Sequence, residues 1–164
     1  MAQSAVLEQL DYNSPGGSVV NGLHRRVIQS VGATRQLLPK ESGSLCLLDR
    51  AAGVVYTLPT PVEGMQFEFL ATVAVTSNAY KVITKTIASE FLLGGIIMGD
   101  VTVAQSGDYF EANGSTHVAI SADGATKGGL LGERYVLTAI STTQWVIHGV
   151  CHGAGTLADP FATS

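Results

Sequence analysis

Short apolar runs rich in β-branched residues recur about every ten residues from position 37 onward, and glycine, asparagine, aspartate or proline separates them. This spacing is typical of an all-β domain, because a short strand and its turn together take about that length. No segment of ten or more residues in this region has a helical period. The pattern predicts a single jelly-roll-like, sandwich or barrel domain. Its strands are expected at Leu45–Asp49, Val54–Leu58, Gln66–Val75, Ala79–Lys85, Ile96–Met98, Val101–Gln105, His117–Ser121, Tyr135–Ile140 and Trp145–Val150.

Alternation within these runs predicts which side chains are buried. Phe67 and Phe69 alternate with polar residues over positions 66–70, as in half-buried antiparallel strands. Trp145 shares a face with Ile147, so we expect it in the core. Asparagine and glycine tolerate a positive φ, and turns are expected at pairs that include Ser77–Asn78, Gly94–Gly95 and Asn113–Gly114.

Residues 1–36 lack this pattern. They contain a turn cluster at 13–18 and a basic segment at 24–26, with no sustained helical or strand period. We expect an irregular, extended N-terminal arm over 1–36, followed by a β-domain over 37–164. The first fourteen residues do not resemble a signal peptide, and no apolar run reaches the length of about 20 residues that a membrane-spanning helix needs. We therefore expect synthesis in a reducing cytoplasm and no membrane partner.

Charged residues are scarce. Only 13% of the chain is Asp, Glu, Lys or Arg, about half of the typical fraction of about 25%. The net charge of −4 argues against a nucleic-acid partner, which requires basic excess. The stretches 94–103 and 125–131 are nearly neutral. Because the cores of protein interfaces are depleted in charge, we expect these two faces to be covered by other protein.

A histidine and cysteine cluster near the C-terminus is a poor metal site. In a strand, His148 and His152 would share a face while Cys151 points the opposite way, and a structural zinc site needs four ligands. Cys151 also lacks the orienting third group of a cysteine nucleophile. Both cysteines, Cys46 and Cys151, lie in apolar runs, so we expect buried, reduced thiols. We expect no metal and no catalytic residue here.

Two further motifs lack the context that their chemistry needs. The segment Gly153–Ala158 approximates a dinucleotide fingerprint, but the required helix cannot follow because Pro160 comes two residues later. The acidic residues in glycine turns lack the spacing of a calcium loop and are better explained as turn caps; they are Asp100, Asp108, Glu111 and Asp123. No cofactor is expected.

Several segments, in order and spacing, resemble bacteriophage head decoration (cement) proteins. The segment 56–69, YTLPTPVEGMQFEF, is similar to their opening of a strand, Leu-Pro-x-Pro, glycine and aromatic-x-aromatic, and the strand entry at 76–83 follows it. The strand at 132–140, the Trp-x-Val-x-Gly ending at 143–149 and the close at 155–161, GTLADPF, are also similar. The resemblance covers about residues 45–161 and does not include the N-terminal region.

The resemblance implies a non-enzymatic virion protein on the capsid exterior, made in the host cytoplasm. It implies a homotrimer that binds the outside of an icosahedral head and clamps neighbouring major capsid subunits. We expect the arm to contribute to the contact, although an arginine pair such as 25–26 is also common on solvated loops. The candidate partner-binding residues are Leu23, His24, Arg25, Arg26, Val27 and Gln36.

Two other functions share the β architecture. A tail-fibre or carbohydrate-binding module would need an exposed aromatic platform for sugar, whereas we expect Trp145 in the core. A small β-fold hydrolase would need His148, His152 and Cys151 together beside a cavity.

Overall fold

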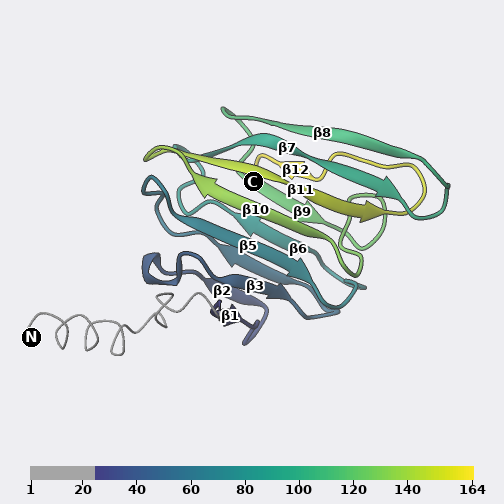
Figure 1. Ribbon diagram of the computed structural model, residues 1–164, viewed down its shortest axis with the longest axis horizontal. Helices are drawn as coiled ribbons and strands as arrows, with labels where there is room; N and C mark the ends of the chain where they lie inside the picture. The colour runs from purple at the N-terminus through teal and green to yellow at the C-terminus, as the bar shows by residue number, and fades with distance from the viewer. Residues whose placement is uncertain (1–24) are drawn as a thin grey trace, which may run out of the picture.

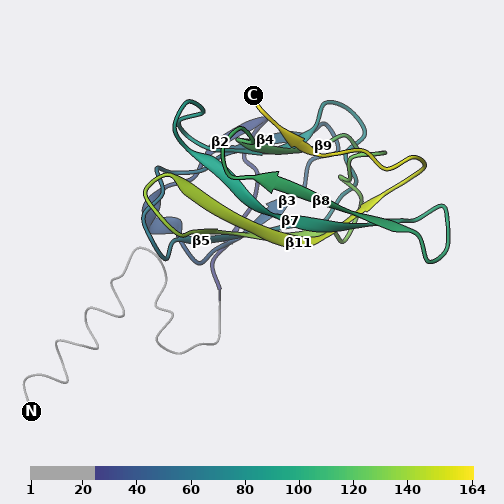
Figure 2. The same ribbon diagram turned by 90° about the horizontal axis from the view of Figure 1, so that it is seen from above.

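The computed structural model describes residues 25–164, which form two β-sheets packed face to face (Figures 1 and 2). The all-β sandwich expected from the sequence is therefore confirmed. The strands are β1 (Val27–Ile28), β2 (Thr34–Gln36), β3 (Leu45–Leu48), β4 (Val54–Thr57), β5 (Gln66–Ala71), β6 (Tyr80–Ile83), β7 (Phe91–Asp100), β8 (Gly107–Asn113), β9 (Ala119–Ala122), β10 (Arg134–Ala139), β11 (Gln144–Gly153) and β12 (Phe161–Ala162). A 3-10 turn, η2 (Pro39–Glu41), precedes β3. No helix within residues 25–164 is long and apolar enough to cross a membrane.

The first six strands alternate between the two sheets. The seven-stranded sheet has the order β1-β3-β5-β10-β11-β7-β8, and the five-stranded sheet has the order β12-β9-β6-β4-β2. The chain thus winds around the core, and β1, β3 and β5 are parallel to one another, as are β2, β4 and β6. The expectation of antiparallel strands was therefore right for only part of the pairing, since β7 and β11 are also parallel.

The core lies between the sheets and is rich in aromatic side chains. Trp145, Phe67 and Phe69 are fully buried, as their alternation predicted. Phe69 stacks on Tyr135 at a centroid distance of 5.5 Å, and Phe67 lies 6.0 Å from Trp145. These contacts join β5, β10 and β11 on the inner face of the seven-stranded sheet.

The turn predictions were partly right. Asn78 has a φ of +57° and Gly114 a φ of +75°, as expected for tight turns. The turn expected at Gly94–Gly95 was wrong, because both residues lie within β7. A Cβ on Gly94 would lie 2.5 Å from the Ile147 carbonyl oxygen of the paired strand, so glycine is needed there for close strand packing.

The hairpin that joins β7 to β8 corrects two further expectations. The strand predicted at Val101–Gln105 is instead the loop of this hairpin, where Asp100 accepts hydrogen bonds from the Thr102 amide and hydroxyl. Strand β8 was not predicted, because its sequence GDYFEAN has no alternation of apolar and polar residues and begins and ends with the turn formers glycine and asparagine.

The end of the predicted arm joins both sheets. Residues 1–24 lie outside the described residues. Residues 25–36 follow the edges of the sandwich, with β1 paired to β3 and β2 paired to β4. These two short strands place Arg25, Arg26 and Gln36 on the body of the domain.

Candidate partner-binding surface

Arg25 is held on the outer face of the seven-stranded sheet by a buried glutamate. Glu68 forms salt bridges with both Arg25 and Arg134, and only 4% of Glu68 is exposed. The Arg25 Nε atom also donates to the Gly43 carbonyl oxygen at 3.0 Å. Burial alone would raise the pKa of Glu68, but the two guanidinium groups bond to its charged form and lower that pKa. Two arginines share one carboxylate, which leaves one positive charge at this position.

Arg26 and Arg35 share a second buried glutamate. Their Nη2 atoms lie 3.1 and 3.0 Å from the Glu41 Oε1 atom. The Glu41 Oε2 atom accepts a hydrogen bond from the Leu38 amide at 2.9 Å and so caps the 3-10 turn. Because Arg26 precedes β1 and Arg35 belongs to β2, this carboxylate ties the edges of the two sheets together.

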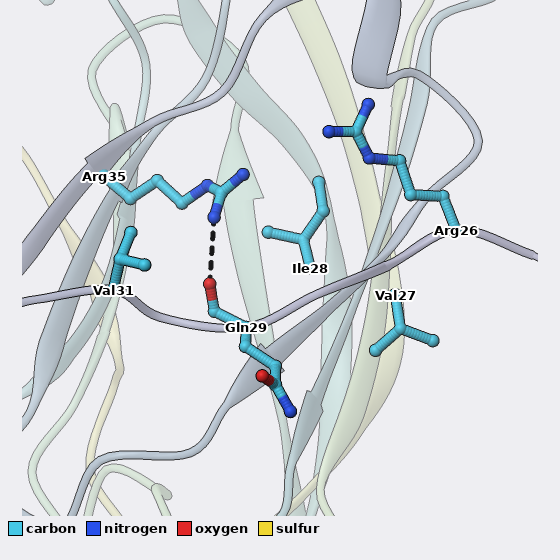
Figure 3. A pocket seen from close by; sticks show the side chains of 6 residues that line it. All are labelled: Arg26, Val27, Ile28, Gln29, Val31 and Arg35. Carbon is cyan, nitrogen blue, oxygen red and sulfur yellow. Dashed lines mark hydrogen bonds between the residues drawn. The ribbon is translucent and has the colours of Figure 1, made fainter. Parts of the chain in front are cut away.

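An open pocket of about 390 Å³ lies between these edges. Figure 3 shows the guanidinium groups of Arg26 and Arg35 on the same side of the segment 26–31, with the Ile28 side chain between them. Arg35 donates to the Gln29 carbonyl oxygen at 2.9 Å. Val31 lies at the rim of the pocket and is 87% exposed, so apolar surface adjoins the two arginines. The pocket therefore combines two arginines with an apolar rim, a combination common in protein interfaces.

Three of the predicted partner-binding residues lie close together. Arg25, Arg26 and Val27 are consecutive at the edge of the seven-stranded sheet, and Val27 is 53% exposed. Gln36 is exposed at the end of β2, in the other sheet. Leu23 and His24 lie outside the described residues.

The residues that position this surface were missed by sequence reasoning. They are Arg35, Glu41, Glu68 and Arg134, which come from four separate segments. Glu68 faces away from the phenylalanines, as the alternation predicted, and the two arginines then cover it. One signal in the sequence could have indicated the buried glutamates. Three arginines, at 25, 26 and 35, lie close together in sequence, and such a group needs carboxylate partners when it packs against the domain.

A second exposed surface is apolar and lies on the outer face of β11, β7 and β8. Val150, Ile97 and Tyr109 occupy directly paired positions on these three neighbouring strands. They are 48%, 58% and 63% exposed. Paired residues point to the same face of a sheet, so the three side chains form one continuous row, called the apolar row below.

The two neutral stretches meet at one end of the sandwich. The β7–β8 loop carries Val101 and Val103, which are 60% and 54% exposed, and Leu131 is 66% exposed. Segment 154–155 links the two stretches, since its amides donate to Ala125 O at 3.0 Å and to Thr102 Oγ1 at 3.2 Å. Both neutral stretches thus carry exposed apolar side chains.

The cysteines and histidines of the described part of the chain do not form a common site. Cys46 and Cys151 are free and buried, as predicted, and burial raises the pKa of the Cys46 thiol to about 12 and that of the Cys151 thiol still further. His148 is exposed on the outer face, opposite the buried Cys151. Within residues 25–164, no group of three or more His, Cys, Asp or Glu residues has the geometry to hold a metal ion.

No protein-family model matches the chain, and neither the curated proteins nor the solved structures include a significant match to it.

Proposed function

We propose that the chain is a structural virion protein that binds the outer surface of an icosahedral phage head as a homotrimer. In this proposal it stabilises the capsid by clamping neighbouring major capsid subunits. The observation that carries the proposal is the set of exposed apolar side chains on the apolar row and on the two neutral loops. Its members are Ile97, Val101, Val103, Tyr109, Leu131 and Val150.

Such a surface is costly in water and favourable when another protein covers it. Completing the burial of a half-exposed valine or isoleucine contributes about 1 kcal/mol, and a contiguous group of such side chains marks a protein-binding site. A protein that binds only the assembled shell stabilises that state by mass action. Three linked copies also bind together with a higher effective concentration than single copies. The resemblance of the segments 45–161 to decoration proteins points to the same role.

The apolar surface provides a direct test. We expect Val103→Asp to weaken binding to purified phage heads by tenfold or more, because a carboxylate would have to be buried without a partner. Val62→Asp is the matched control, since Val62 is 55% exposed and lies outside the neutral stretches. Equal head affinity of the two variants, measured by co-sedimentation, would argue against the assigned surface.

The arm provides a second test. Deleting residues 2–24 leaves β1, β2 and both shared glutamates in place, so we expect a folded trimer with weakened head binding. Deleting 2–36 would also remove three arginines that neutralise buried carboxylates, which makes it the poorer choice. If deletion of residues 2–24 left head affinity unchanged, these residues would not contribute to the contact with the capsid. A monomeric mass together with no affinity for mature or immature heads would overturn the whole proposal.

Carbohydrate binding is the alternative function, and it would depend on Tyr109. Trp145 is fully buried and is not available to stack on a sugar, whereas Tyr109 is exposed on a sheet face. Glycan-array binding that is lost in Tyr109→Ala would favour this alternative.

A further inference from the structure

Strand β8 is the one long unpaired sheet edge among residues 25–164. It has seven residues, while the other three edge strands, β1, β2 and β12, have two, three and two. Proteins protect edge strands with shortness, proline, charged side chains (lysine above all) or bulges, because a free edge can pair with another chain. The sequence of β8 contains no proline or lysine, and its charged residues are Asp108 and Glu111. Its pairing with β7 runs without a bulge from Asn113 to Gly107.

The hydrogen-bond alternation shows which groups of β8 are free. The Asp100 amide donates to the Ser106 oxygen at 2.9 Å, and the Gly114 amide donates to the Leu92 oxygen at 2.8 Å. In an antiparallel ladder every second residue bonds to the neighbouring strand, so the even-numbered residues of β8 bond to β7. The odd-numbered residues direct their N–H and C=O groups outward. They are Gly107, Tyr109, Glu111 and Asn113.

One of these outward amides already has a partner. The Asn113 N–H donates to the His117 Nδ1 atom at 3.2 Å. Three consecutive outward positions, Gly107, Tyr109 and Glu111, therefore have no partner among residues 25–164 and remain available for a new strand.

The Tyr109 side chain leaves this edge open. A Cβ on Gly95 would lie 2.5 Å from the Tyr109 hydroxyl oxygen, so the ring leans over the glycine of its own sheet and away from the free edge. The apolar row therefore ends at β8 with an exposed aromatic ring that does not itself cover the outward backbone groups. A strand added here would gain both hydrogen bonds and apolar contact.

We propose that two copies of this chain pair through antiparallel β8 strands about a two-fold axis at Tyr109, which joins their seven-stranded sheets. In this register Tyr109 lies opposite Tyr109 of the second copy, and Gly107 lies opposite Glu111 of the second copy. The pairing uses all three available positions. A register centred on Phe110 would instead need the occupied Asn113 amide.

The charges and the apolar row fit this register. Asp108 lies opposite Phe110 of the second copy, and Glu111 lies opposite Gly107, so no carboxylates face each other directly and like-charge repulsion is avoided. The apolar row continues across the axis, from Val150 and Ile97 of one copy to the same residues of the other. The same surface serves both copies, as a two-fold contact requires.

This pairing goes beyond the proposed function, because it joins copies whether or not they are bound to a particle. A contact along one strand buries less than the roughly 1,200 Å² of a stable interface, so we expect it to be weak in dilute solution. Copies held side by side on a surface would pair more completely, because their effective concentration is higher.

Disulfide trapping tests the pairing in the full-length protein. Under mild oxidation, we expect Tyr109→Cys to form a covalent dimer at least tenfold faster than Val31→Cys, whose site is 87% exposed but lies in the β1–β2 loop. The native cysteines do not interfere because both are buried. Equal cross-linking rates for the two variants would overturn the proposal.

A proline variant separates strand pairing from random collision. Adding Glu111→Pro to Tyr109→Cys removes an N–H that β7 does not use, so we expect the cross-link to fall to the control rate in a protein that remains folded by circular dichroism. If the fast cross-link persisted in this double variant, the proposed hydrogen bonding between the two β8 strands would be wrong.

Sedimentation provides a measurement that does not depend on the proline variant folding. We expect the wild-type mass to rise above that of its smallest species as concentration increases, and this rise to be lost in Tyr109→Lys but kept in Ile140→Lys. A mass independent of concentration, or equal behaviour of the two lysine variants, would overturn the pairing. Neither assay uses phage heads, so failure here is distinct from failure of the proposed function.

Discussion

Glu133 is a buried carboxylate whose ionisation opposes folding. It is fully inaccessible to solvent, and its Oε2 atom accepts a hydrogen bond from the Gly129 amide at 2.7 Å, while no residue within 25–164 hydrogen-bonds to its Oε1 atom. Burial raises the pKa of Glu133 to about 7, because hydrogen bonds from backbone amides, such as that of Gly129, only partly compensate for the lost hydration of the carboxylate. The titratable groups that face it are Tyr80, Tyr135 and Cys151, all of which have raised pKa values and are neutral at pH 7.

The sign of the pH dependence follows from proton binding. Between pH 4.5 and about 7 the folded state holds the Glu133 proton and the unfolded state has released it. The free energy of unfolding therefore falls as pH rises through this window and levels off above it. A shift of this size corresponds to about 3 kcal/mol.

Glu133→Gln keeps the shape of the side chain and removes the titration. We expect the variant to match the wild type near pH 4 and to exceed its free energy of unfolding by about 3 kcal/mol at pH 8. Urea unfolding followed by Trp145 fluorescence at fixed protein concentration measures this difference. Glu63→Gln is the control, because Glu63 is exposed on a loop. A constant difference between Glu133→Gln and the wild type from pH 5 to 8 would refute the reasoning.

Two further perturbations test the fold. Gly94→Ala would place a Cβ 2.5 Å from the carbonyl oxygen of a paired strand at a φ of +100°, so we expect a loss of about 2–4 kcal/mol in urea unfolding. Gly99→Ala, with open space around its Cβ, is the control, and a similar loss there would contradict this account. We expect Cys46 and Cys151 to resist a thiol-specific reagent in the native protein and both to react after unfolding, because both are buried and burial holds the pKa of Cys46 near 12. Rapid labelling of either thiol in the native state would contradict the burial.

The local strand pattern could be predicted from the sequence because it depends on neighbouring residues. The alternation that buries Phe67 and Phe69 and the turn propensity of Asn78 are both local properties, and both were predicted correctly. Trp145 was placed in the core for the same reason. These features needed no knowledge of which strands are neighbours.

The errors arose where distant segments decide the local structure. Gly94 is a turn former by composition, yet it lies in mid-strand because the backbone at Ile147 passes too close for a side chain. Likewise, the alternation placed Glu68 on the face opposite the phenylalanines but did not show that Arg25 and Arg134, 43 and 66 residues away in sequence, cover it. The parallel partners in the two sheets were not predicted, since nothing within a strand shows how the chain winds around the core.

The position of β10 and β11 has a consequence for the order of folding. In the seven-stranded sheet this hairpin lies between β5 and β7, although both of those strands precede it in the chain. Strands β1 to β6 and the β7–β8 hairpin can form first. The edges of β5 and β7 that face each other then stay unpaired until residues 134–153 insert between them. We therefore expect late closure of this sheet during synthesis, with two open edges that can associate wrongly with other chains before closure.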